Sequence, residues 1–424
     1  MADSRTHTNR THGNSSPDLD GLMAWLDSSP TPFHAVASAA AVLGAAGFTQ
    51  VHGLADELPG TGYLAIDGAL LAWRLGEARA PYRILGAHTD SPNLRVQPTP
   101  DMSSHGWAQI GIEVYGGVLL NSWLDRDLGI AGRIVDEEGR AHLFDIAEPL
   151  ARIPQLAIHL DRAVNDSGLL LDKQNHMMPV WGTTAVSFRE WLGSVTSSSS
   201  VAGFDAHLYD LTPARRIGHD STLLASARLD NQVSCWAAIH AISTADASSH
   251  THIVVLNDHE EVGSESATGA AGPLLDRLID VITHRNGLTP GERHDVLARS
   301  FCLSADNAHA VHPNYPERHE PRHAPRPNAG PALKLNGNQR YATSARGVAF
   351  LRGVAEAHSV PMQTFVSRNN VPCGSTIGPI TATRLGIEAI DIGVPQLSMH
   401  STREMCGADD PVHLLHLARA FLGA

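Results

Sequence analysis

Apolar residues recur along the chain at two spacings, one typical of helices and one typical of strands. The first helical stretch has apolar residues three and four positions apart: Leu19, Leu22, Met23 and Leu26. After a Ser-Pro-Thr-Pro break, a second helix rich in alanine and valine is predicted over 34–46, ending at Gly47. Residues 1–16 are polar and show no periodicity, so the sequence predicts a disordered tail there.

Short apolar runs alternate with helical stretches toward both ends of the chain. Strands are predicted over 62–66, 70–74, 82–86, 253–256, 301–304, 363–366 and 389–392. Helices are predicted over 232–243, 273–283, 344–358, 380–385 and 411–422. This alternation is typical of an α/β sheet domain.

The middle of the chain, residues 92–225, has a different pattern of apolar and polar residues. Strands separated by turns are predicted over 109–114, 130–135 and 206–211, with few long helices. The serine run 197–200 predicts a flexible loop. The simplest organisation is one α/β domain made of 17–91 and 226–424, interrupted by a β-rich insertion of 92–225.

Length, charge and cysteine spacing narrow the class of protein. The chain has 424 residues, enough for two domains or for one domain with a large insertion. Its net charge of −13 disfavours nucleic acid, and no apolar run approaches the ~18 residues that a membrane helix needs. No secretory signal is evident, and the four cysteines form no CxxC pair, so we expect a cytoplasmic protein without a disulfide framework.

The candidate chemistry lies in polar segments that directly follow apolar runs. Five such segments contain His88 with Asp90, Asp230, Glu260 with Glu261, Asp306, and His400. In an open α/β sheet, ligands bind at the carboxyl ends of the strands, so segments that are distant in sequence meet there. We therefore expect these side chains to form one site.

Each of these segments also has a simpler interpretation. His88 and Asp90 are two residues apart and point the same way in an extended chain, which suits a metal-binding histidine held by a carboxylate. A buried His–Asp pair is the alternative. Asp230 precedes a predicted helix, so it either bridges two cations or caps the helix N-terminus.

Glu260 and Glu261 follow a buried strand as adjacent carboxylates, which repel each other unless a cation lies between or near them. We predict that Glu261 binds metal and that Glu260 remains free as the general base, the alternative being a solvated acidic turn. His309 and His312, three residues apart, could share one helical face and are expected to line the pocket rather than to bind metal.

Two histidines and three carboxylates suit a pair of bridged divalent ions roughly 3.5–4 Å apart. Glu260 is then not needed as a ligand. Nitrogen and oxygen ligands without thiolates favour Zn²⁺, with Mn²⁺ or Co²⁺ as substitutes. Each segment alone is a weak signal, whereas five in one chain, each at a predicted strand end, are a strong one.

Longer motifs resemble the aspartyl aminopeptidase family. The matching segments are GAHTDSP (86–92), RLDN (228–231), DHEEVGS (258–264), SADNAHAVHPNY (304–315), PCGSTIGP (372–379) and SMHSTRE (398–404). The resemblance spans about Pro32 to the C-terminus. It implies a mixed-sheet, three-layer α/β/α di-metal exopeptidase domain in which the β-rich insertion mediates dimerisation, and tetrahedral dodecamers built from dimers.

The resemblance also implies roles for individual residues. Metal ligands would be His88 and Asp306 for one ion, Glu261 and His400 for the other, and Asp230 as the bridge. Glu260 would be the acid/base, and Asp90 would support His88.

Three further residues match substrate-contacting positions of the family. Lys334, one of only two lysines in the chain, matches the residue that binds an acidic substrate side chain. The alternative is that Lys334 is simply an exposed lysine. Tyr341 matches a residue that stabilises the oxyanion formed during hydrolysis. His159 matches a histidine of the insertion that reaches a neighbouring subunit's site, and a plain strand histidine is the alternative.

These observations predict a metallo-aminopeptidase that hydrolyses peptides with a free N-terminus and prefers Asp or Glu as the first residue. The rival hypotheses are a di-metal deacylase of N-acyl amino acids, a carboxypeptidase, and a catalytically silent assembly or cargo-binding relative. The intact Glu260–Glu261 pair argues against a silent relative, which has no need of a base.

Overall fold

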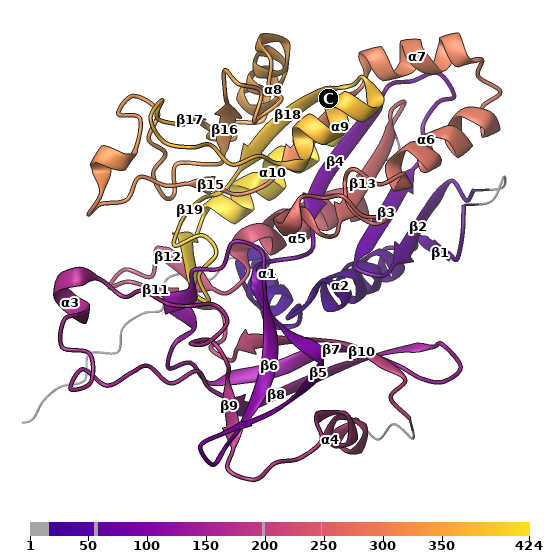
Figure 1. Ribbon diagram of the computed structural model, residues 1–424. Helices are drawn as coiled ribbons and strands as arrows, with labels where there is room; N and C mark the ends of the chain where they lie inside the picture. The colour runs from indigo at the N-terminus through magenta and orange to yellow at the C-terminus, as the bar shows by residue number, and fades with distance from the viewer. Residues whose placement is uncertain (1–16, 55–57, 197–199, 247) are drawn as a thin grey trace, which may run out of the picture.

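The computed structural model describes residues 17–54, 58–196, 200–246 and 248–424 (Figure 1). The tail predicted over 1–16 and most of the serine run 197–200 lie outside the described residues.

A nine-stranded mixed sheet forms the centre of the larger part of the molecule (Figure 1). Its strands, in spatial order, are β1 (Thr49–Val51), β2 (Thr61–Ile66), β3 (Ala69–Arg74), β13 (Thr251–Asn257), β4 (Tyr82–His88), β14 (Phe301–Ala305), β18 (Glu388–Gly393), β16 (Ala332–Leu335) and β17 (Gln363–Val366). Strands β13, β4, β14 and β18 pair in parallel, so their carboxyl ends meet at one edge. Every residue of β4 and β13 is buried, as in a sheet covered on both faces.

Helices cover both faces of this sheet. One apolar core contains α1 (Pro17–Asp27), α2 (Pro32–Ala45), α5 (Leu229–Ser243), α8 (Ala345–Ala357) and α10 (Asp410–Gly423). A second core contains α6 (Leu274–Arg285), α7 (Pro290–Arg299) and α9 (Ile377–Leu385). The predicted three-layer α/β/α architecture is therefore confirmed.

Residues 93–210 contain a second, six-stranded antiparallel sheet with a core of its own (Figure 1). Its strands, in spatial order, are β8 (Ala141–Ala151), β7 (Leu128–Val135), β10 (Gly203–Asp210), β5 (Asn93–Ser104), β6 (Trp107–Tyr115) and β9 (Val180–Gly182). Short helices lie between them: η1 (Leu120–Trp123), α3 (Val164–Ser167) and α4 (Phe188–Val195). Phe188 and Leu192 of α4 are buried in this core.

A third sheet joins the end of the insertion to the C-terminal region. Its order is β11 (Arg215–Ile217), β12 (Leu223–Ser226), β20 (Glu404–Gly407), β19 (Pro395–Leu397) and β15 (Ala308–His309). Because β12 pairs with β20, the start of α5 lies beside the loop that carries His400. Two 3₁₀ turns complete the fold, η2 (Glu260–Val262) and η3 (Pro316–Arg318).

One local expectation was wrong, and one helix was missed. Residues 309–312 form no helix, because Ala308 and His309 are extended and pair with β19. Helix α7 was not predicted at all. Within the described ranges, none of the helices has the length and apolarity needed to span a bilayer.

Candidate active site

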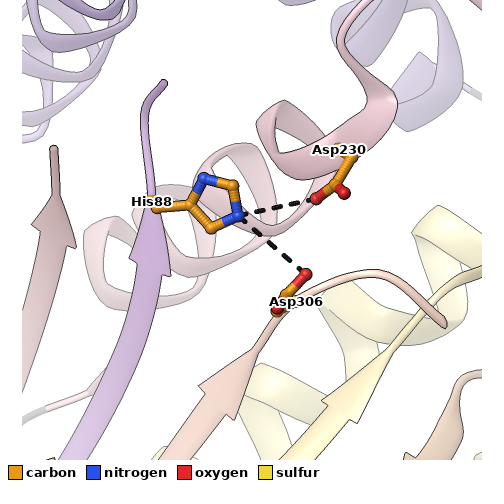
Figure 2. Close-up of side chains that lie close together, drawn as sticks. All are labelled: His88, Asp230 and Asp306. Atoms are coloured by element: carbon orange, nitrogen blue, oxygen red, sulfur yellow. Dashed lines mark ion pairs between the residues drawn. The ribbon is translucent and has the colours of Figure 1, made fainter. Parts of the chain in front are cut away.

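The predicted site residues converge at the carboxyl edge of the parallel strands. His88 is the last residue of β4 and pairs in register with Asn257, the last residue of β13. Asp306 directly follows β14. Figure 2 shows the side chains of His88, Asp230 and Asp306 pointing toward one another from three different elements.

Asp230 is held at the site by the turn that begins α5. The preceding Arg228 has a φ of 58°, and its guanidinium donates hydrogen bonds to the carbonyls of Leu26 and Ser29. Asp230 itself has non-helical dihedral angles. The Asn231 side chain donates to the carbonyl of Ala305 at 2.8 Å, which ties this turn to the end of β14. Asp230 therefore faces the site, and the helix-cap alternative does not apply.

The first cluster is centred on the His88 imidazole. Its Nε2 lies 3.5 Å from Asp230 Oδ1 and 3.9 Å from Asp306 Oδ1, and all three residues are buried. The other ring nitrogen, Nδ1, lies 3.0 Å from the main-chain oxygen of Asp90. A proton on Nδ1 would donate to that oxygen and would leave the Nε2 lone pair facing the two carboxylates, as metal binding requires.

The second cluster is centred on the His400 imidazole. Its Nε2 lies 3.3 Å from Glu261 Oε2 and 3.6 Å from Asp230 Oδ2. Asp230 thus presents one oxygen to His88 and the other to His400. Three groups of side chains are close enough to hold one ion: His88, Asp230 and Asp306; Asp230, Glu261 and His400; and His88, Glu260 and Glu261. The first two groups share Asp230. A carboxylate shared in this way suits a bridging ligand.

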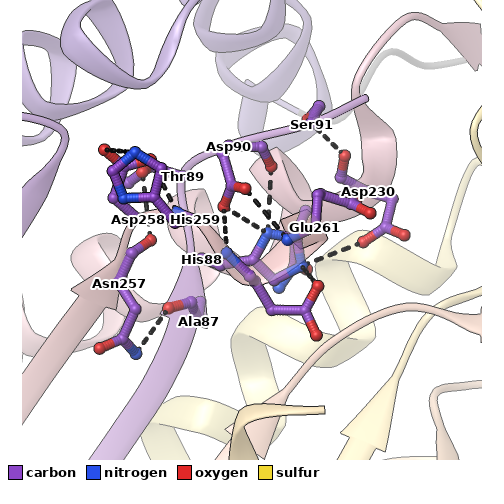
Figure 3. A network of polar contacts seen from close by, with 12 residues as sticks. Ala87, His88, Thr89, Asp90, Ser91, Asp230, Asn257, Asp258, His259 and Glu261 are labelled. Carbon is purple, nitrogen blue, oxygen red and sulfur yellow. Dashed lines mark hydrogen bonds and ion pairs between the residues drawn. The ribbon is translucent and has the colours of Figure 1, made fainter. Parts of the chain in front are cut away.

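Asp90 organises the segment that carries the two glutamates. Its Oδ1 accepts a hydrogen bond from the main-chain N–H of Glu260, and its Oδ2 accepts one from that of Glu261, both at 3.1 Å. The hydroxyl of Tyr115 donates to Oδ2 at 2.7 Å. Figure 3 shows Asp90 between His88 and Glu261. Asp90 Oδ1 also lies 3.4 Å from His88 Nδ1, so Asp90 supports both His88 and the glutamate turn.

Two supporting residues were not assigned from the sequence. Glu404 is buried and accepts hydrogen bonds from the main-chain N–H groups of His400, at 2.7 Å, and Asp230, at 2.9 Å. It lies within the SMHSTRE motif, so its position four residues after His400 was an available signal. Tyr115 comes from β6 of the insertion, and no local pattern linked it to the site.

The electrostatics of the cluster fit bound cations. Burial, with contributions from Asp306 and Asp230, raises the pKa of Glu260 to about 7 although His88 opposes the shift. Burial and Asp230 raise the pKa of Glu261 well above its usual value. Asp230 Oδ1 and Glu261 Oε1 are buried and have no hydrogen-bond partner among the described residues. Divalent cations would relieve both the crowding of negative charge and these unpaired oxygens.

A pocket of about 540 Å³ opens onto the cluster. Lys334 and Tyr341 line it, and both are buried. The Lys334 ammonium lies 3.7 Å from Asp306 Oδ2 and 5.1 Å from the centre of the Tyr341 ring. Lys334 is only 2% exposed, so the exposed-lysine alternative does not apply.

The remaining predicted substrate residues lie in different places. His309 is among the residues that line the pocket. His312 is not among the described residues that line it, and its ring packs against Tyr315 with 4.9 Å between the ring centres. His159 is exposed in a turn of the insertion and likewise does not line the pocket of its own chain as far as the structure describes it.

Comparison with known proteins identifies the family. The family model for aminopeptidase I zinc metalloproteases (M18) matches residues 25–422. A probable M18 family aminopeptidase 2 of Streptomyces coelicolor is 48% identical over 419 residues, which cover 95% of this chain and 97% of the relative. The chain belongs to the M18 family of zinc aminopeptidases. It is therefore a hydrolase, and the match gives no support to a deacylase or a carboxypeptidase.

Solved structures of M18 aminopeptidases share the fold. A chain of the Ape4 and Nbr1 complex is 33% identical with a TM-score of 0.90, covering 96% of this chain and 85% of that chain. The mApe1 dodecamer of S. cerevisiae is 27% identical with a TM-score of 0.83, covering 96% of each chain. An M18 aminopeptidase from Thermotoga maritima, at 23% identity and a TM-score of 0.86, shows the same fold. The predicted di-metal exopeptidase fold is thereby confirmed.

Proposed function

We propose that this M18 aminopeptidase removes N-terminal residues, preferably Asp or Glu, by using two divalent ions, most simply Zn²⁺. Two ligand groups that share the Asp230 carboxylate are the main support for this proposal. His88 and Asp306 would complete one ion site, and Glu261 and His400 the other. When bound, the ions would supply Lewis acidity for the scissile carbonyl and lower the pKa of the attacking water.

The residues around the ions would handle the protons and the developing charge. Glu260 lines the pocket and forms a third possible ligand group with His88 and Glu261, but it lies outside the two groups that share Asp230. With the ions held by those two groups, Glu260 would take the proton of the water and return it to the leaving amine. The Tyr341 hydroxyl would donate a hydrogen bond to the oxyanion. Asp90 would fix Glu260 through the main-chain N–H that it accepts.

The base assignment is tested by Glu260→Gln. The amide has nearly the same shape but cannot accept the proton, so turnover should fall by roughly 10²–10⁴-fold. Zinc content, measured by elemental analysis, should stay near the wild-type value because Glu260 is not one of the proposed ligands. Near-normal turnover with full zinc content would refute the role of Glu260.

The proposed preference for acidic first residues rests on Lys334. The structure buries this ammonium in a pocket with Tyr341 and His309, where a substrate carboxylate would complete an ion pair. A fully buried lysine is uncommon unless it has a partner. Asp306, its nearest carboxylate, would be engaged by metal.

The proposed assembly is a tetrahedral dodecamer built from six dimers, located in the cytoplasm, with peptides as substrates. The mApe1 dodecamer supports the assembly. The insertion also exposes large apolar side chains close together in sequence: Leu156, Ile158, Leu160 and Leu170. Exposed apolar clusters are typical of interaction surfaces. All four cysteines are free thiols, which suits a reducing compartment.

A further inference from the structure

Glu404 connects the two halves of the metal-binding cluster through the main chain. Its carboxylate is 2% exposed and lies at the start of β20. One oxygen accepts the N–H of His400 at 2.7 Å, and the other accepts the N–H of Asp230 at 2.9 Å. Asp230 lies in the first turn of α5 and His400 in the loop between β19 and β20, far apart in sequence, so a single side chain fixes their relative positions.

The contacts have a geometry that only a carboxylate provides at this position. Each oxygen faces an N–H donor, and an amide in the same place would turn its own N–H₂ group toward one of them. His400 depends on such support because it lies in a loop with a left-handed φ of 68°. Its ring has one further polar anchor outside the cluster, with Nδ1 at 3.1 Å from the carbonyl of Gly117.

We infer that Glu404 is a positioning residue that sets the spacing of His400 and Asp230 and thereby the affinity for the ion between them. The inference rests on the two-metal site proposed above. Asp230 Oδ1 and Glu261 Oε1 are buried and unpaired among the described residues, as expected of oxygens arranged for a cation. Glu404 itself binds no ion, since both its oxygens are directed at main-chain N–H groups.

The test compares zinc binding by the metal-free wild type, Glu404→Gln and Glu388→Gln. Glu388 is a matched control because it is a half-buried glutamate of β18 that accepts a hydrogen bond from Ser344 and lies at the strand end remote from the site. Zinc is titrated in competition with a chromophoric chelator. Second-sphere contacts of metal ligands typically contribute 10–100-fold to affinity, so Glu404→Gln should weaken at least one of the two binding steps by roughly that factor.

A second readout separates positioning from general stability. The zinc concentration that gives half-maximal activity should rise in Glu404→Gln by the same factor, whereas the KM for peptide at saturating zinc should stay near the wild-type value. Glu388→Gln should show neither change. If Glu404→Gln does not fold, Glu404→Asp replaces it, because the shorter side chain keeps the charge but withdraws both oxygens from the N–H groups.

The outcomes distinguish this inference from the proposed function. Two zinc ions bound by the wild type, and bound as tightly by the Glu404 variant, would overturn the positioning role and leave the metal site intact. A wild type that binds no zinc would overturn the metal site and this inference with it.

Discussion

Lys334 is the residue on which the proposed substrate preference depends. Its ammonium is buried 3.7 Å from Asp306, at the inner wall of the pocket. Lys334→Ala removes the partner of an acidic substrate side chain, and hydrogen bonds to charged groups contribute about 1.5–3 kcal/mol. We expect the ratio of kcat/KM for Asp-naphthylamide over Leu-naphthylamide to fall by roughly 10–100-fold.

The other lysine of the chain supplies the control. Lys173 is exposed in the insertion, so Lys173→Ala removes the same side chain without touching the pocket. It should leave the preference unchanged. An unaltered Asp-to-Leu ratio in Lys334→Ala would remove Lys334 from the specificity pocket.

Site residues differed in how far the sequence revealed them. His88 ends a buried strand, and Asp306 and Glu261 follow buried strands, so the rule that ligands gather at strand ends was enough to bring them together. The contact of Glu404 with the main-chain N–H of Asp230, and that of Tyr115 with Asp90, join segments that are distant in sequence. No local periodicity encodes such contacts.

The contact between α2 and the insertion sheet contains a buried, uncharged histidine. His207 of β10 is 4% exposed, its Nδ1 lies 3.0 Å from Asn93 Oδ1, and its ring meets the edge of Phe33 of α2 at 6.0 Å. Burial, reinforced by Arg95, lowers the pKa of His207 to about 3. Arg133 and His34 act in the same direction, and Asp205 opposes them.

This histidine predicts acid sensitivity of the fold. Below about pH 6.5 the histidine is protonated in the unfolded chain but stays neutral in the folded protein. The contribution of His207 to the free energy of unfolding is therefore fully present above pH 6.5 and is lost as the pH falls toward 3. At pH 5 the loss amounts to roughly 2 kcal/mol. We expect His207→Gln to be less stable than the wild type at pH 7.5 but to lose less unfolding free energy between pH 7.5 and pH 5.

Urea denaturation of the metal-free protein in chelator measures this difference without interference from metal release. His219→Gln is the control, because His219 is 93% exposed in the turn between β11 and β12. It should follow the wild-type pH dependence. A His207 variant with the wild-type slope would contradict the assignment of a buried neutral histidine.

Elements were predictable where an apolar pattern marked them. Helix α7 escaped prediction because it is highly charged and only Val296 and Leu297 are buried, although Thr289 and Glu292 form a capping box. Helix α9 begins at Ile377, whereas the predicted start was 380. The prediction began too late because Gly378 and Pro379 are residue types that usually end or interrupt a helix. A Cβ at Gly378 would lie 2.3 Å from Asp391 Oδ1, so close packing explains that glycine.

At the level of the whole molecule, the proposed assembly predicts shared active sites. His159 is exposed between Ile158 and Leu160, two exposed apolar residues of the insertion, and does not line its own chain's pocket as described. If it completes a neighbour's site, His159→Ala should lower kcat/KM without changing zinc content. Light scattering should give a particle of twelve 45.2 kDa subunits.

Mixed assemblies test the sharing directly. Co-expressed His159→Ala and Glu260→Gln subunits would form some sites with Glu260 from one chain and His159 from the other. Such mixtures should be more active than either variant alone, whereas His219→Ala should behave like the wild type throughout. Mixtures no more active than the average of the two variants would place His159 outside the neighbour's site.

The proposed function depends on two ions that share Asp230. Crystals of the zinc-loaded protein allow the ions to be located by anomalous diffraction at the zinc edge. We expect two peaks per chain, one contacted by His88 and Asp306, the other by Glu261 and His400, with Asp230 between them. A single peak, or peaks away from these five side chains, would refute the two-ion site.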